Sequence, residues 1–196
     1  YLLSNERLNA WIDEGWVKLI GEKFGETIGY KREDKKYLNT IKSYLSIAGT
    51  YKDIPLITPS NLLDPGINFN VSYSKSACAQ QYLLELMAAK GIANPLKIFI
   101  ERWAGKHPTP YDFFNTMDNI AGEDLSWFWR PWYFEFSSPD LAILSVNESD
   151  GKYSLLIENS GGIPLPINLK FFYKSGEFEM LNYPVTVWQK HEKTCM

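Results

Sequence analysis

The strongest constraint on the fold is a change of pattern at Pro139. Before this residue, apolar side chains recur at helical spacing, and capping residues bound the segments. After it, short runs rich in β-branched and aromatic residues alternate with turn signals. We therefore predict an α+β fold, with a mostly helical body over residues 1–137 and a small antiparallel β unit, resembling part of a β-sandwich, over residues 138–196.

Helices are expected near residues 5–21, 31–49, 71–90, 95–105, 110–122 and 123–129. Gly21 and Gly25 are expected to end the first helix, and Pro131 is expected to break or kink the last. Residues 50–70 contain three prolines and are expected to form a loop, and a loop of this length can line a substrate groove.

Asn94 and Thr109 each precede a proline and are expected to cap the helices that follow, the second with Asp112 in its first turn and Gly122 as its stop. Strands are expected at residues 141–146, 153–158, 167–173, 178–181 and 185–188. Asp150-Gly151 and Ser175-Gly176 are expected to be hairpin turns.

The composition excludes some classes of partner. The net charge of −3 argues against nucleic acid or an anionic membrane as the main partner. No apolar run approaches the ~18 residues that a transmembrane helix needs. Two cysteines, Cys78 and Cys195, lie far apart and do not assign a redox compartment.

The stretch Trp-Ile-Asp-Glu-Gly-Trp at residues 11–16 places a carboxylate between two tryptophans. In a helix, Glu14 lies at the edge of an apolar side that includes Ile12 and Trp16. A carboxylate near an apolar face needs a cation, a donor or a metal. Residue spacing alone leaves two interpretations of Glu14, a surface residue of an amphipathic helix or a metal ligand.

This stretch resembles the motif W-[IL]-x-E-G, which supplies the third zinc ligand in the aminopeptidase N-like zinc metallo-aminopeptidases, a gluzincin family. The resemblance implies that Glu14 is a zinc ligand. It also implies an H-E-x-x-H helix roughly twenty residues earlier, carrying the other two ligands and the general base. The two histidines, His107 and His191, stand in no such motif. We therefore expect the chain to be the part of the catalytic region downstream of that motif.

A second motif follows 73 − 14 = 59 residues later. Tyr73-Ser-Lys75-Ser76-Ala resembles Y-x-K-G-A of the same family, in which the tyrosine hydroxyl donates to the oxyanion at the zinc. Ser76 departs from the family's glycine. The resemblance implies that Tyr73 is catalytic, and the alternative is a half-buried aromatic residue.

A third stretch, residues 106–132, resembles a bacterial branch of the same family. The region ends in an aromatic cluster: Trp127, Phe128, Trp129, Trp132, Tyr133, Phe134 and Phe136. Helical spacing favours a core seam over a sugar-binding surface for this cluster. His107 has no partner at ligand spacing, so we interpret it as a structural or surface histidine.

The resemblance implies a zinc-dependent enzyme that hydrolyses peptides from the N-terminus, with zinc as cofactor and a peptide as substrate. With only one ligand present, the chain alone is expected to be inactive and to hold no stoichiometric zinc. The alternative is a non-catalytic, aminopeptidase-like scaffold that binds protein or glycan. The sequence leaves open the substrate-binding residues, the residue preference, the oligomeric state and the compartment, a periplasmic or secreted location being compatible with it.

Overall fold

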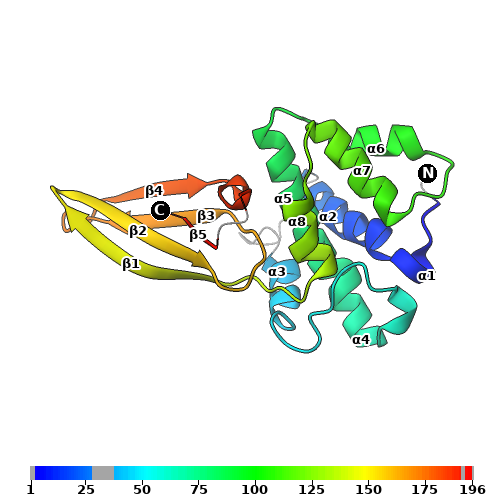
Figure 1. Ribbon diagram of the computed structural model, residues 1–196. Coiled ribbons are helices and arrows are strands. Elements are labelled where there is room, and N and C mark those ends of the chain that lie inside the picture. The colour runs from blue at the N-terminus through cyan, green and yellow to red at the C-terminus, as the bar shows by residue number, and fades with distance from the viewer. Residues whose placement is uncertain (1–2, 28–37, 191–192, 196) are drawn as a thin grey trace.

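The computed structural model describes residues 3–27, 38–190 and 193–195. It has the predicted α+β fold. Helices form a body, and two β-hairpins project from one side of it (Figure 1). The last helical segment before the hairpins ends at Phe134 and the first strand begins at Leu141, so the change falls at Pro139 as expected.

The helical body is built from short and medium helices. They are α1 (Glu6–Asn9), α2 (Trp11–Thr27), α3 (Leu38–Leu45), α4 (Pro65–Asn68), α5 (Ser76–Ala89), α6 (Pro95–Trp103), α7 (Pro110–Ala121) and α8 (Ser126–Trp129). Two π-helical segments adjoin them, η2 (Phe69–Lys75) before α5 and η3 (Arg130–Phe134) after α8. A 3-10 turn, η1 (Ser60–Leu62), lies within the proline-rich connection.

The first expected helix is divided into α1 and α2, and it ends later than expected. Gly21 and Gly25 lie inside α2, which runs for 17 residues, so the prediction that they end the helix is wrong. A glycine inside a helix costs only about 1 kcal/mol relative to alanine, and packing of α2 on its neighbours can outweigh that cost. The expected start of the second helix, residues 31–37, lies outside the described residues. Its described part, α3, ends at Leu45, before the turn in which Gly49 has a φ of +68°.

Pro131 does not break the helix that contains it. The hydrogen-bond pattern changes from α to π at Arg130, and the helix continues as η3 to Phe134. Proline has no N–H to donate to an α-helical acceptor, and the wider π turn accommodates that gap. The helix also begins later than expected, at Ser126, whose N–H is bound by the Asp124 carboxylate at 2.7 Å.

The capping predictions hold at α7 and fail in part at α6. Thr109 and Asp112 form a reciprocal capping box at the start of α7, and Gly122 ends that helix with a φ of +71°. Asn94 occupies the N-cap position of α6, but its side chain makes no capping hydrogen bond.

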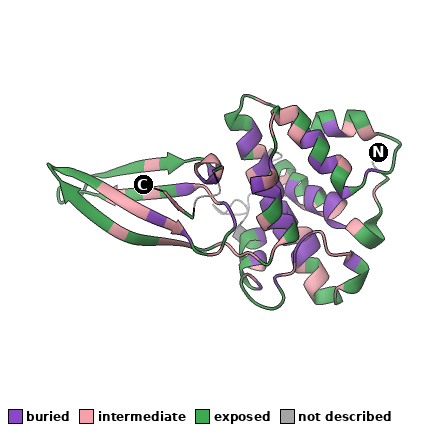
Figure 2. Ribbon diagram, viewed as in Figure 1, coloured by how far each residue is buried: buried purple, intermediate pink, exposed green. Residues whose placement is uncertain are grey.

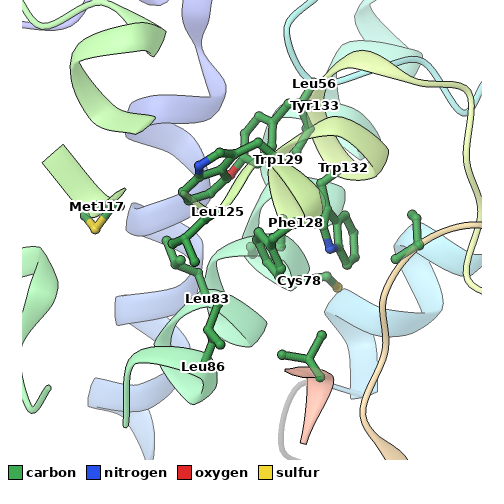
Figure 3. Close-up of a cluster of buried hydrophobic side chains, with 14 of the residues drawn as sticks. Leu56, Cys78, Leu83, Leu86, Met117, Leu125, Phe128, Trp129, Trp132 and Tyr133 are labelled. Carbon is green, nitrogen blue, oxygen red and sulfur yellow. The ribbon is translucent and has the colours of Figure 1, made fainter. Parts of the chain in front are cut away.

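The core of the helical body is largely aromatic. Its fully buried side chains come mainly from α2, α5, α6, α7, α8 and η3, and Figure 3 shows how several of them converge. The large ones include Trp11, Phe99, Phe113, Phe128, Trp132 and Tyr133. In Figure 2 the buried residues concentrate in the helical body, whereas the hairpins are mostly exposed. Within the described ranges, no helix is both long and apolar enough to span a bilayer.

The β unit consists of two antiparallel sheets. One has the order β1 (Leu141–Ser149), β2 (Lys152–Asn159), β5 (Thr194–Cys195), and the other pairs β3 (Ile167–Phe172) with β4 (Phe178–Tyr183). The short strand β5 was not predicted. The strand expected at residues 185–188 is instead a 3-10 turn, η4 (Val185–Trp188). Side chains three residues apart lie on one side of such a turn, so Val185 and Trp188 are both buried.

Specific contacts fix the linker at Ser138 against the β unit and join the β unit to the helical body. Gly161 lies so close to the linker that a Cβ there would overlap the carbonyl oxygen of Ser138. The amide of Ser138 in turn donates to the Gly161 carbonyl at 2.7 Å. Gln189, just after η4, donates to Glu123 at 3.1 Å, and Glu123 also pairs with Lys90 of the α5 C-terminus at 2.7 Å. These contacts hold the two parts together beside α5.

Candidate functional site

The two motif residues Glu14 and Tyr73, 59 positions apart, meet in the folded chain (73 − 14 = 59). The Tyr73 side chain lies beside the Glu14 carboxylate, and both residues are half-buried. Hydrogen bonding to this carboxylate, followed by burial and the charge of Glu14, raises the pKa of Tyr73 to about 12. The phenol therefore stays protonated at neutral pH and remains a hydrogen-bond donor.

Glu14 is positioned by the start of α2, which is fixed in the aromatic core. It lies in the first helical turn, where the helix dipole favours a carboxylate. Trp11, three residues earlier, stacks on Phe114 at a centroid distance of 5.8 Å and meets the Tyr133 ring edge-on at 4.7 Å. Trp16, two residues later, contacts Phe113 at 6.3 Å. The two tryptophans of the motif thus hold the helical turn that carries Glu14.

Gly15, directly after Glu14, lies where α2 crosses α5. A Cβ at this position would lie 2.5 Å from the Ser76 hydroxyl oxygen and 2.7 Å from the Gln80 amide nitrogen. The same Gln80 amide donates to the Trp11 carbonyl at 3.0 Å. The glycine therefore permits α2 to cross α5 closely, and this crossing brings the first turn of α2 next to η2.

Ser76 stands where the family motif has glycine, and the crossing accommodates it. Its hydroxyl is buried and donates back to the Ser72 carbonyl within the same helix. With Gly15 opposite, the serine side chain fits between the two helices. The serine at position 76 therefore changes the local packing between the two helices and leaves Tyr73 in place.

Tyr73 is carried by the π-helical turn η2. Its ring stacks on Phe69 at 5.1 Å with an interplanar angle of 25°. The Ser72 hydroxyl donates to the Asn68 side chain at 2.6 Å, which ties the turn to α4. Lys75 at the end of the turn is fully buried. Short π-helical insertions often occur at functional sites, where they re-aim side chains.

The surroundings of the pair are acidic. The carboxylates of Glu6 and Asp13 lie close enough to Tyr73 to disfavour its ionisation further. Lys18 is the neighbouring cation, with its ammonium 5.9 Å from the Phe69 ring centroid and 3.9 Å from Glu22. The site therefore favours a positively charged or metal-bound ligand over an anionic one.

The described residues contain no complete site for a metal ion. A catalytic zinc needs three protein ligands, and no group of three or more His, Cys, Asp or Glu side chains that could hold a metal occurs in the described part of the chain. His107 is exposed and its Nδ1 lies 2.9 Å from the Leu3 carbonyl oxygen, consistent with a structural histidine. His191 lies outside the described residues.

The proline-rich segment packs into the body at its centre. Leu56 and Asp53 are buried, and the Ile57 amide donates to the Tyr133 carbonyl at 2.9 Å. A surface cavity of about 620 Å³ lies elsewhere, beside α1. It is lined by residues 3–6, 8, 9 and 107–109, including Glu6 and His107.

The aromatic cluster is a core seam for five of its seven members. Trp127, Phe128, Trp129, Trp132 and Tyr133 are buried, whereas Phe134 is 38% exposed and Phe136 is 79% exposed. Buried rings cannot stack on a sugar, so the packing interpretation is the one that the structure supports.

Sequence reasoning missed Asp53, which forms a buried ion pair with Lys75 at 2.7 Å. One signal could have found it. Lys75 stands among small residues in a helix whose other residues are mostly apolar, and a buried lysine needs a carboxylate partner. Comparison of the sequence with models of known protein families and with curated protein sequences finds no match.

Proposed function

We propose that the chain is the downstream part of the catalytic region of a zinc metallo-aminopeptidase. The observation that supports this most is that the Tyr73 side chain lies beside the Glu14 carboxylate. Glu14 and Tyr73 belong to two separate sequence motifs, and they are distant in the chain. A family in which these motifs serve one reaction centre requires them to meet.

In this proposal Glu14 supplies one zinc ligand, and two histidines from outside the chain supply the others. Bound zinc would contribute Lewis-acid polarisation of the scissile carbonyl and a more acidic water. Tyr73 would donate a hydrogen bond to the oxyanion that develops at the carbonyl oxygen of the substrate. Its pKa of about 12 suits this role, because the hydroxyl keeps its proton at neutral pH.

The acidic surroundings are compatible with a peptide that presents a free α-amine. Glu6 and Asp13 add negative charge near the reacting groups. A protonated amine is attracted to such a site.

The first experiment is metal analysis of the chain after dialysis against a zinc-free buffer. The proposal predicts no stoichiometric zinc, because one carboxylate is a poor site for a tetrahedral ion. One tightly held zinc per chain that is lost in Glu14→Ala would contradict the idea that the remaining ligands lie outside the chain. Peptidase activity of the chain alone would contradict it as well.

The second experiment uses a longer protein that includes the upstream residues and the expected H-E-x-x-H. Glu14→Gln should abolish zinc binding and turnover together. Tyr73→Phe should keep the zinc and the fold but lower kcat by roughly 10²–10³-fold, with an equal fall in kcat/KM. Tyr51→Phe, at a tyrosine that is 81% exposed, removes a hydroxyl elsewhere and should leave both constants unchanged. Near-normal turnover of Tyr73→Phe would leave Tyr73 with a packing role only.

The alternative function is an aminopeptidase-like scaffold that binds protein or glycan. It is favoured by the exposed apolar side chains on the β unit, such as Ile143, Val146, Phe172 and Phe178, all more than half exposed. The upstream sequence separates the two proposals. An H-E-x-x-H about nineteen residues before Glu14 supports the enzyme, and its absence there supports the scaffold.

A further inference from the structure

A buried ion pair lies directly behind the turn that carries Tyr73. The Lys75 ammonium is 2.7 Å from Asp53 Oδ1, and the side chains of Lys75 and Asp53 are 0% and 3% exposed. The same ammonium donates to the Ile54 carbonyl at 3.1 Å and lies 5.8 Å from the centroid of the Tyr44 ring. The second carboxylate oxygen of Asp53 accepts from the Gly49 amide at 3.0 Å and from the Tyr44 hydroxyl at 3.4 Å.

These contacts join four parts of the chain. Tyr44 comes from α3, Gly49 from the turn after it, Asp53 and Ile54 from the start of the proline-rich segment, and Lys75 from the end of η2. Burial lowers the pKa of Lys75, and the charge of Asp53 opposes that effect. Since burying two charges is costly, an apolar pair of similar volume would often stabilise a protein at least as well. Selection for stability alone therefore does not account for the pair.

The position of Lys75 suggests what the pair does. Lys75 is the last residue of η2, and Tyr73 lies two residues before it, with Lys75 fully buried and Tyr73 half-buried. A π-helical turn has few intrinsic sources of stability and could relax to an α-helical register. Such a change rotates every side chain of the turn and would remove the Tyr73 hydroxyl from Glu14. The contacts of the Lys75 ammonium with Asp53 and with the Ile54 carbonyl oppose that rotation.

We propose that Asp53 and Lys75 are positioning residues, which hold η2 in the register that places the Tyr73 hydroxyl on Glu14. This inference rests on the proposed function for its catalytic consequence, but not for its structural part. The pair does not touch the reacting atoms. It acts through Tyr73.

The test is a set of three variants of the chain, Lys75→Met, Asp53→Asn and the two combined. Each single change leaves one buried polar group without its partner and should lower the midpoint of thermal unfolding clearly. The combined change removes both charges at similar volume and should recover most of that loss. The combined variant therefore separates positioning from stability.

The readout is the ¹⁹F NMR signal of Tyr73 in protein labelled with 3-fluorotyrosine, assigned by its loss in Tyr73→Phe. In the combined variant, despite its recovered stability, this signal should shift towards its position in Glu14→Gln, because the hydroxyl has left the carboxylate. A matched control neutralises the partly exposed pair Lys90–Glu123, with Lys90→Met and Glu123→Gln, and should leave the Tyr73 signal unmoved. An unshifted signal in the combined variant would overturn the proposal.

The catalytic consequence is measured separately in the longer protein. The combined variant should lose at least 10-fold in kcat with KM unchanged, the pattern of a lost transition-state contact. If kcat returns together with stability, the pair is merely structural and the proposal fails. A shifted Tyr73 signal in a protein that proves to have no peptidase activity would support the positioning role while rejecting the proposed function.

Discussion

Replacing Gly15 with alanine tests whether the close crossing of α2 and α5 positions the site. The new methyl group would lie 2.5 Å from the Ser76 hydroxyl oxygen and 2.7 Å from both polar atoms of the Gln80 amide. Contacts of this kind are too short to persist, so the helices must separate or both side chains must move. If Gln80 moves, its hydrogen bond to the Trp11 carbonyl is lost.

The expected magnitude follows from three contributions. Overpacking of a well-packed site costs about 1–3 kcal/mol. Loss of the buried hydrogen bond from Gln80 costs about 1 kcal/mol more. Alanine gains about 1 kcal/mol over glycine inside a helix. The free energy of unfolding should therefore fall by about 1–3 kcal/mol in Gly15→Ala.

Gly21 is the matched control, because it lies in the same helix and a methyl group added there would have no neighbour within 4 Å. Gly21→Ala gains helix propensity without a clash and should raise the free energy of unfolding by about 0.5–1 kcal/mol. Urea unfolding followed by far-ultraviolet circular dichroism measures both variants. The ¹⁹F signal of Tyr73 should also change in Gly15→Ala and not in Gly21→Ala.

The opposite signs of the two variants are the decisive feature. If Gly15→Ala is as stable as Gly21→Ala, the crossing is looser than the distances imply, and Gly15 does not set the approach of α2 to η2. If Gly15→Ala is destabilised while the Tyr73 signal is unchanged, the crossing serves stability alone.

Two further predictions concern the attachment of the β unit and the behaviour at alkaline pH. Gly161→Ala should lower the free energy of unfolding by about 3 kcal/mol or more, because the added methyl group meets the backbone oxygen of Ser138, which cannot rotate away. A variant whose free energy of unfolding stays close to that of the wild type would contradict this. Burial raises the pKa of Tyr82 to about 12 and raises that of Tyr133 further still. The stability that these buried, neutral phenols contribute is therefore complete below their pKa in the unfolded chain, near 10, and is lost as the pH rises above it. Urea unfolding at pH 8–11 should show this decline, and Tyr133→Phe should weaken it; an unchanged pH dependence in that variant would count against the assignment.

Much of the fold was predictable because local patterns agree with tertiary packing. The Thr109–Asp112 capping box and the Gly122 stop depend on neighbouring residues alone, and both occur as expected. The errors are of another kind. Gly21 did not end α2, and residues 185–188 did not form a strand. In each case packing between distant segments outweighed a local preference.

Local sequence patterns were enough to specify the order of the elements, the change from helix to strand near Pro139 and the residues that carry candidate chemistry. Hydrophobic periodicity and turn residues are local signals, so they can be recognised in a single amino-acid sequence. Tertiary packing was needed to bring Glu14 to Tyr73, to make Gly15 the point where two helices cross and to pair Asp53 with Lys75. These contacts depend on the approach of segments far apart in the chain, and no local pattern specifies the distance between them.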